Sequence, residues 1–235
     1  MTLKWLSSYA PVDEEFGNVS LLLHGDGTNG STTIVDSSSS PKAVTAVGNA
    51  QISTAQSKFG GSSIAFDGTG DYLTSAANAA FDYAAGDFTI EGWFNSANTS
   101  LLQTVIGQAP FDGVNVNGYA IRIVNTGLSI NYYDNSGIPL FILGDVTTLS
   151  SNVWYHFAAT REGNVFRLFI NGILEASATN SISFATGKSL YVGRWEGFTD
   201  RDFNGYIDDV RITRGVARYD ANFTPPTAPF PEVLG

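Results

Sequence analysis

Residues 154–172 read WYHFAATREGNVFRLFING, and this stretch decides the fold class. Two runs rich in aromatic and β-branched residues are separated by a turn at residues 161–164, as expected for consecutive strands. Asn171-Gly172 follows the second run directly. This dipeptide is the strongest two-residue hairpin signal, because both central positions of the turn need a positive φ. The stretch therefore predicts a series of antiparallel strands.

The same alternation of short β-forming runs and turn residues extends outward over most of the chain. Residues 88–94 place Phe88 and Ile90 on one face of a strand and Glu91 on the other. Strand candidates recur at ~8–12-residue intervals with turn signals between them, which is typical of two packed sheets. The expected fold is all-β: an antiparallel two-sheet β-sandwich of the jelly-roll type. The residues expected in its core are Phe66, Tyr72, Phe88, Ile90, Trp154, Phe157, Leu168, Ile170, Val192, Ile207 and Val210.

The composition agrees with this fold and argues against several functions. Of the 235 residues, 14% are charged, and 12 basic residues face 22 acidic ones, for a net charge of −10. This charge argues against nucleic acid or an anionic membrane as the main partner. The chain has no cysteine, which excludes disulfides, a thiol nucleophile and a thiolate metal site. No apolar run approaches the ~18 residues of a membrane span.

Three regions are expected along the chain. Residues 1–18 are polar and aperiodic and are interpreted as an N-terminal arm, either frayed or ordered by a partner. Residues 19–223 form one sandwich domain, and residues 224–235 form a proline-rich C-terminal tail that lies extended along the surface. The first residues lack the apolar segment of a secretory signal, so a protein that starts at Met1 would not be exported by that route. A signal peptide that has been trimmed away is the alternative.

Four segments together resemble a known family. They are, in order, residues 63–73, residues 87–94, residues 154–160 with 168–172, and residues 205–212. In this order they are similar to the laminin-G-like, concanavalin A-like jelly-roll superfamily, over the range from Leu21 to Tyr219. The resemblance implies a two-sheet jelly roll. The ending at residues 214–226 resembles versions found in bacteriophage structural proteins, which implies a virion setting.

Oxygen-rich loops near both ends of the domain are candidate calcium ligands. The resemblance implies that such loops meet the Asp-Asp-Val segment at residues 208–210 and hold one ion there. Calcium takes about six to eight oxygen ligands and accepts backbone carbonyls from irregular loops. The alternative is that these residues cap their own turns, and Asp209 is expected to pair with Arg211 or another nearby arginine. The candidate ligands are Asp26, Asn29 (through its carbonyl), Asp36 and Asp208.

Two polar-aromatic loops are candidate ligand-binding surfaces. Residues 195–202 combine aromatic, arginine and aspartate side chains in an expected exposed loop, and residues 111–118 form a similar loop. Such side chains suit a sugar or a protein interface. The alternative is that the arginines pair with nearby aspartates and only solvate this end of the sandwich. The candidate ligand-binding residues are Trp195, Phe198, Arg201, Asn115 and Asn117.

Catalysis is not expected from the motifs present. Glycoside hydrolases of the resembled superfamily use two carboxylates on one strand, and a retaining pair lies ~5–5.5 Å apart. The sequence has no Glu-x-Asp-x-Glu arrangement that would supply them. It also has no Gly-x-Ser-x-Gly elbow and no glycine-rich phosphate loop that opens a helix.

The expected function is that of a non-enzymatic virion protein of a bacteriophage, as a capsid-decoration or tail-associated subunit, with host-surface glycans as a candidate ligand. Its partners would be other virion proteins or glycans, and a homo-trimer is expected by analogy with phage surface subunits. The alternative is a calcium-dependent carbohydrate-binding module of an extracellular bacterial protein. Calcium is the candidate cofactor in both cases.

Overall fold

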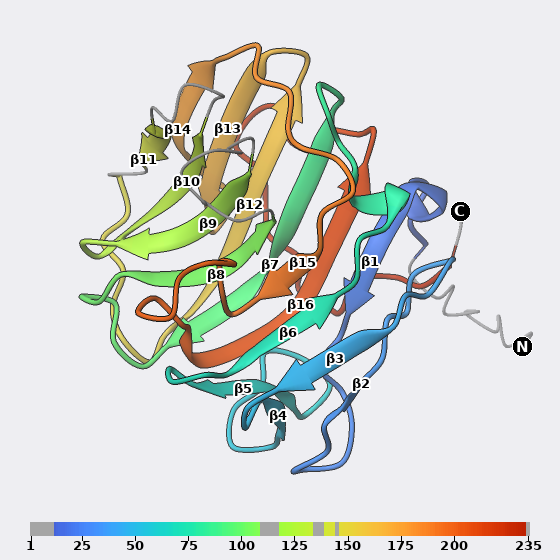
Figure 1. The fold of residues 1–235 in the computed structure, drawn as a ribbon, viewed down its shortest axis with the longest axis vertical. Coiled ribbons are helices and arrows are strands. Elements are labelled where there is room, and N and C mark those ends of the chain that lie inside the picture. The colour runs from blue at the N-terminus through green and yellow to red at the C-terminus, as the bar shows by residue number, and fades with distance from the viewer. Residues whose placement is uncertain (1–11, 109–117, 134–138, 144–145, 234–235) are drawn as a thin grey trace, which may run out of the picture.

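The fold is a sandwich of two antiparallel sheets, as the computed structural model shows (Figure 1). The structure describes residues 12–108, 118–133, 139–143 and 146–233. Besides strands, the described residues contain two short 3-10 helices, η1 (Phe16–Asn18) and η2 (Ala79–Phe81). The expected all-β jelly-roll class is therefore confirmed. In the described part of the chain, no helix has the length and apolar composition needed to span a bilayer.

Each sheet has eight strands, and each combines runs of strands that are consecutive in the chain with strands from distant segments. Sheet 1 contains, in spatial order, β14 (Ile173–Thr179), β13 (Val165–Ile170), β12 (Trp154–Glu162), β7 (Phe88–Ser96), β16 (Asn204–Arg214), β5 (Ser63–Asp67) and β4 (Gln51–Ser53), with β1 (Val19–Leu23) paired to β16. Sheet 2 contains β11 (Pro139–Leu143), β10 (Gly127–Tyr133), β9 (Tyr119–Val124), β8 (Gln103–Gln108), β15 (Leu190–Val192), β6 (Tyr72–Ser75), β3 (Val44–Val47) and β2 (Thr33–Ile34).

The stretch at residues 154–172 forms β12 and β13, and Asn171-Gly172 connects β13 to β14. Ile170 pairs with Ile173 across this turn. Asn171 has a φ of 48° and Gly172 a φ of 75°, which is the conformation that the dipeptide predicts. A Cβ on Gly172 would lie 1.9 Å from the carbonyl oxygen of Phe223, so the turn also needs glycine for space.

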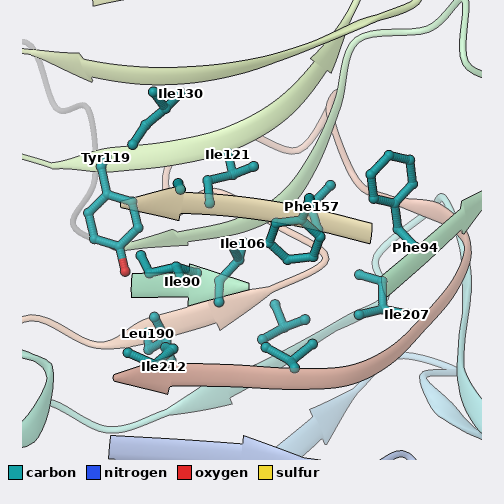
Figure 2. Close-up of a cluster of buried hydrophobic side chains, with 14 of the residues drawn as sticks. Ile90, Phe94, Ile106, Tyr119, Ile121, Ile130, Phe157, Leu190, Ile207 and Ile212 are labelled. Carbon is teal, nitrogen blue, oxygen red and sulfur yellow. The ribbon is translucent and has the colours of Figure 1, made fainter. Parts of the chain in front are cut away.

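The core lies between the inner faces of the two sheets (Figure 2). Ile90, Phe94 and Phe157 of sheet 1 meet Ile106 and Ile121 of sheet 2, and all five side chains are fully buried. The alternation in β7 therefore places its apolar side chains as expected. Burying each such side chain contributes roughly 1.5–3 kcal/mol, which makes this layer the main source of stability.

Two expected core residues lie outside this layer. Tyr72 and Trp154 are only half-buried and do not belong to the core cluster. In β6, Leu73 and Ser75 are buried, so Tyr72 points outward. Trp154 pairs with Asn95, which alternates with the core residue Phe94, so Trp154 lies on the outer face of sheet 1. The prediction failed because an aromatic residue at a strand end was assumed to face inward.

The segments that precede β1 and follow β16 in the chain pack against the outer face of sheet 1. A second apolar cluster contains Phe16, Val19, Leu22 and Phe230. The backbone N–H of Asp13 donates to the carbonyl oxygen of Val233 at 2.8 Å. Within the expected arm, residues 12–18 are thus held on the sandwich together with the tail.

Candidate functional site

The outer face of sheet 1 carries a buried ion network centred on Glu91 of β7. Arg211 of β16 donates from Nε (3.0 Å) and Nη2 (2.7 Å) to Glu91 Oε1. The Tyr219 hydroxyl donates to Oε2 at 2.8 Å. Burial alone would raise the pKa of Glu91, but Arg211, His156 and Arg218 outweigh it and lower the pKa to about 2. Glu91 is therefore ionised at neutral pH, with both oxygens engaged.

Asp13 extends this network to the N-terminal segment and the tail. Its carboxylate accepts 2.9 Å and 2.8 Å hydrogen bonds from Nη1 and Nη2 of Arg218, and a third from Arg211 at 2.9 Å. Next to it, the Phe59 ring and the Lys58 ammonium lie over Trp93, with Lys58 Nζ 3.8 Å from the ring centroid. These segments cover the part of sheet 1 around Glu91 and Trp93.

An open groove begins where this cover ends, at the start of β16. Tyr206 points outward from β16 and is half-buried, between Ala65 of β5 and Asn95 of β7 in the strand register. Its hydroxyl has no hydrogen bond to another residue in the described part of the chain. The groove is lined by Asn49, Gln51, Ala65, Phe66, Asp67, Asp71, Ala97, Asn152, Asn204, Gly205 and Tyr206.

Amide and carboxylate side chains surround the tyrosine. Asn49 donates from Nδ2 to Asp67 Oδ2 at 3.3 Å, while Gln51 and Asn152 are exposed. A Cβ on Gly68, which has a φ of 84°, would lie 2.9 Å from the Cβ of Asn204, so this glycine gives Asn204 its place at the groove. Amides present both donors and acceptors. The groove thus combines one accessible aromatic ring with several free polar groups.

The sequence did not predict this groove. Its residues come from separate strands and turns, and no motif connects them. One signal was present: Ile207 was assigned to the core, so alternation along β16 places Tyr206 on the outer face. That signal gives the direction of the tyrosine but not its neighbours.

The loop at residues 195–201 differs from the expectation in one important respect. Trp195 was expected to be exposed, but it is 1% exposed and the expectation is wrong. Its indole covers Gly107 of β8, where a Cβ would lie 3.1 Å from Trp195 Cδ1. Phe198 packs on Trp195 with ring centroids 5.2 Å apart, and Arg201 lies 4.0 Å over the Phe198 ring. Asn115 and Asn117 lie outside the described residues.

The neighbouring arginines do pair with aspartates. Arg194 donates from Nε (2.7 Å) and Nη2 (2.5 Å) to the buried carboxylate of Asp202. Asp202 Oδ2 also accepts a 2.8 Å hydrogen bond from the N–H of Gly70. Arg201 Nε lies 3.3 Å from Asp200 Oδ1. These contacts fix the loop to the turn before β6, and they match the alternative in which the charges pair locally.

Two of the expected calcium ligands approach the same segment. Asp208 Oδ2 accepts hydrogen bonds from the N–H groups of Lys58 (2.7 Å) and Phe59 (3.1 Å), whereas its buried Oδ1 has no partner in the described chain. Burial is the main cause that raises the pKa of Asp208 to about 7. The carboxylate of Asp26 lies against Gly60, where a Cβ would overlap it. Asp26 and Asp208 therefore both border residues 58–60.

The side chains of the other two expected ligands already accept hydrogen bonds from nearby backbone groups. Asp36 Oδ1 accepts from the N–H groups of Leu22 (3.0 Å) and Ser38 (2.9 Å). Its Oδ2 accepts from the N–H of Lys42 (2.7 Å) and the Ser38 hydroxyl (3.0 Å). The side-chain oxygen of Asn29 accepts from the next loop at 3.0 Å. Among the described residues, no three acidic or histidine side chains gather closely enough to hold a metal.

Asp209 does not pair with Arg211 by a hydrogen bond, contrary to the expectation. Its Oδ1 is 2.6 Å from His24 Nδ1, and its Oδ2 accepts from the N–H of Phe230 at 2.9 Å. The cause is a β-bulge between Asp208 and Arg211, with Asp209 at a φ of 48°. The bulge breaks the strict alternation that the prediction assumed.

Sequence comparison places this architecture in a family. Residues 67–218 match a family described as the concanavalin A-like lectin/glucanases superfamily. The chain belongs to this superfamily. Among curated protein sequences, none is significantly similar to it.

Solved structures share the superfamily fold at low sequence identity. The binding domain of Paraclostridial Mosquitocidal Protein 1 is 18% identical with a TM-score of 0.68, covering 86% of this chain and 50% of its own. The receptor binding domain of botulinum neurotoxin D is 18% identical with a TM-score of 0.65, covering 86% and 50%. This chain thus spans half the length of those domains. Domain 4 of AbnA, an extracellular arabinanase from Geobacillus stearothermophilus solved with arabinotriose, is 18% identical with a TM-score of 0.63, covering 85% and 94%.

Proposed function

We propose that this chain is a non-catalytic carbohydrate-binding domain and that the groove beside Tyr206 is its glycan site. The observation that carries the proposal is the half-buried, outward-facing ring of Tyr206 surrounded by the amides of Asn49, Gln51 and Asn152. A sugar ring has an apolar C–H face that packs on an aromatic ring, and its hydroxyls need both donors and acceptors, which amides supply. The arabinotriose held by domain 4 of AbnA supports a sugar as the ligand.

The described carboxylates support a binding role over catalysis. Asp71 in the groove accepts from the N–H groups of Asn49 (2.5 Å) and Asp67 (2.9 Å), so its oxygens hold the turn together. Glu91 is enclosed by arginines and remains ionised at neutral pH, so it carries no proton to donate as a general acid. Glycoside hydrolysis needs two available carboxylates facing one sugar.

Calcium is proposed as the cofactor that joins the loops beside Asp208. The unpartnered, buried Oδ1 of Asp208 and the nearby Asp26 fit a cation, with backbone carbonyls as further ligands. Asp36 does not fit, because four donors already surround it. When bound, the ion would supply positive charge that holds Asp208 ionised and fixes the loop of Gly25 and Asp26. Calcium chloride should raise the melting temperature, and an unchanged melting curve in calcium and in chelator would exclude this site.

A virion surface is the proposed setting, with an extracellular bacterial protein as the alternative. The proposal depends on the phage-like ending at residues 214–226. Capsid or tail genes beside the gene for this chain would support it, and a neighbouring glycosidase gene would favour the alternative. The proposed homo-trimer is tested by light scattering of the purified protein.

The glycan site is tested by binding of neutral oligosaccharides, starting with arabinotriose, in isothermal titration calorimetry. Tyr206→Ala should weaken binding at least about tenfold, as expected for a central aromatic contact. Tyr206→Phe keeps the ring and should retain most of the affinity. Equal affinity of Tyr206→Ala and the unaltered protein, or no binding across a broad panel of neutral glycans, would overturn the proposal.

A further inference from the structure

A second pocket lies near the opposite end of β16 from the groove. Tyr206 and Arg214 are separated by roughly 25 Å along the strand, at ~3.3 Å per residue. Four separate parts of the chain form this pocket: the segment from η1 to β1, the loop before β3, η2 and the end of β16. Its lining residues are Gly17, Asn18, Val19, Ser20, Ser39, Ser40, Lys42, Asn78, Ala80 and Arg214.

The charge of this pocket is opposite to that of the whole chain. The chain carries a net charge of −10, yet the lining contains two cations, Lys42 and Arg214, and no carboxylate. Neither cation lies within 4.0 Å of a carboxylate oxygen in the described part of the chain. Most other described arginines pair with acidic side chains, so this arrangement is unusual for the molecule.

The two cations have few protein partners. In the described part of the chain, Lys42 Nζ donates one hydrogen bond, to the Ser38 hydroxyl at 3.4 Å. Arg214 donates from Nε to the carbonyl oxygen of Asp82 at 3.0 Å, and its two terminal nitrogens have no partner among the described residues. Burial lowers the pKa of Lys42 even though the Asp36 carboxylate acts in the opposite direction. Lys42 is half-buried and Arg214 is exposed, so both have donors that can contact a ligand in the pocket.

Three acidic side chains near this pocket have hydrogen-bond partners of their own. Asp36 accepts four hydrogen bonds from its own loop and from β1. The Asp82 carboxylate accepts from the N–H of Gly187 at 2.7 Å. Glu15 accepts from the amide of Asn18 at 2.6 Å. Asp36 still acts electrostatically on Lys42, but none of the three carboxylates lies within 4.0 Å of either cation.

Neutral polar groups complete the lining. The side-chain oxygen of Asn78 accepts from the N–H of Ala80 at 2.9 Å, which leaves its amide N–H groups as donors. Ser39 and Ser40 add hydroxyl groups that donate and accept. A bare inorganic anion needs only donors, whereas a sugar that carries an acidic group also presents hydroxyls. The mixture of cations, hydroxyls and an amide suits the second kind of ligand.

We propose that this pocket binds a saccharide through a single oxyanion, a carboxylate or a sulfate, held between Lys42 and Arg214. Charge-assisted hydrogen bonds from an ammonium and a guanidinium are the contacts that such a group requires. The saccharide part of this inference rests on the proposed function, and the oxyanion part does not. The protein would then hold an acidic glycan at one end of β16 and a neutral one at the other.

The test compares four ligands by calorimetry: a glucuronate-containing oligosaccharide, its 6-sulfated counterpart, the matching neutral oligosaccharide and sodium sulfate alone. The two acidic saccharides should bind at low salt and weaken as the salt concentration rises. Lys42→Gln and Arg214→Gln should each weaken them at least about tenfold, the value of one charge-assisted hydrogen bond. Lys42→Arg keeps the charge and should retain binding of the acidic saccharides. Lys188→Gln removes a lysine outside the pocket and should leave their affinity unchanged.

Each outcome decides one part of the inference. Equal binding of acidic and neutral saccharides, or acidic binding that survives Lys42→Gln in a folded protein, overturns it. Sodium sulfate alone binding as tightly as the sulfated saccharide overturns the saccharide part. Loss of neutral binding in Tyr206→Ala with acidic binding retained shows two independent sites. Acidic binding without any neutral binding supports this pocket and rejects the glycan groove.

Discussion

The stability of the fold at acidic pH should depend on Glu91. Its pKa falls from an ordinary 4.5 to about 2 in the folded protein. At 1.36 kcal/mol per pKa unit, this difference corresponds to about 3 kcal/mol. A carboxyl whose folded pKa is lowered stabilises the protein above its unfolded pKa, and this stability disappears as the pH falls from 4.5 to about 2.

Thermal melts of the unaltered protein and of Glu91→Gln, from about pH 7 to about pH 2, measure this contribution. Glu91→Gln should be about 3 kcal/mol less stable at neutral pH, which lowers the melting temperature by roughly 6–12 °C for a chain of this length. The difference between the two proteins should shrink to well below about 1 kcal/mol at about pH 2, because Glu91 is then protonated in the unfolded chain and about half protonated in the folded protein.

Glu162 provides the matched control. It lies on the neighbouring strand β12 and pairs with Arg167 at 3.1 Å, but its side chain is 55% exposed. An exposed pair contributes about 0–1 kcal/mol, so Glu162→Gln should melt like the unaltered protein. A loss of less than about 1 kcal/mol in Glu91→Gln at neutral pH, or a loss that stays constant down to about pH 2, would contradict this role of Glu91.

Other contacts give predictions of their own. Gly172→Ala should cost at least about 1 kcal/mol, because its φ is 75° and a Cβ would overlap Phe223; Gly163→Ala, with a φ of 56° in open space, should cost less in the same urea melts. Phe230→Ala should cost about 3–5 kcal/mol in urea melts, since the ring is buried against Leu22, and an unchanged midpoint would show that the tail adds no stability. Calcium chloride should raise the melting temperature more at about pH 8 than at about pH 5.5. The folded pKa of Asp208 is raised from 3.8 to about 7. Without metal, protonated Asp208 stabilises the fold below about pH 4, and this stability is lost as the pH rises to about 7. Only the ionised carboxylate binds the metal, so calcium binds more strongly at the higher pH. Equal shifts at both pH values would contradict this.

The fold could be predicted because its signals are local. The turn at Asn171-Gly172 and the alternation along β7 depend on residues close together in the sequence, and both were interpreted correctly. Tyr72 and Trp154 were misplaced because the inward face of a strand end depends on the register with its neighbours. Register is a property of pairs of strands, and a single strand does not encode it.

The sites were harder to predict because side chains compete for the same partners. Asp36 has the residue type of a calcium ligand, but four local donors occupy it. Trp195 has the residue type of a sugar platform, but the missing side chain at Gly107 leaves a space that the indole fills. Conversely, Lys42 and Arg214 are far apart in the sequence. The pairing of β1 with β16, together with the hydrogen bonds of Asp36 to Leu22 and Lys42, brings their segments together.

The hydrogen bond between Asp13 and Val233 also bears on how this domain can be connected to other polypeptides. Asp13 and Val233, near opposite ends of the sequence, lie side by side, so a short linker could join them. New chain ends could then be placed at an exposed turn such as the one at Gly163. The same proximity would allow the whole domain to be inserted into a surface loop of a host protein without stretching it. Circular permutation and domain insertion are therefore both compatible with this architecture.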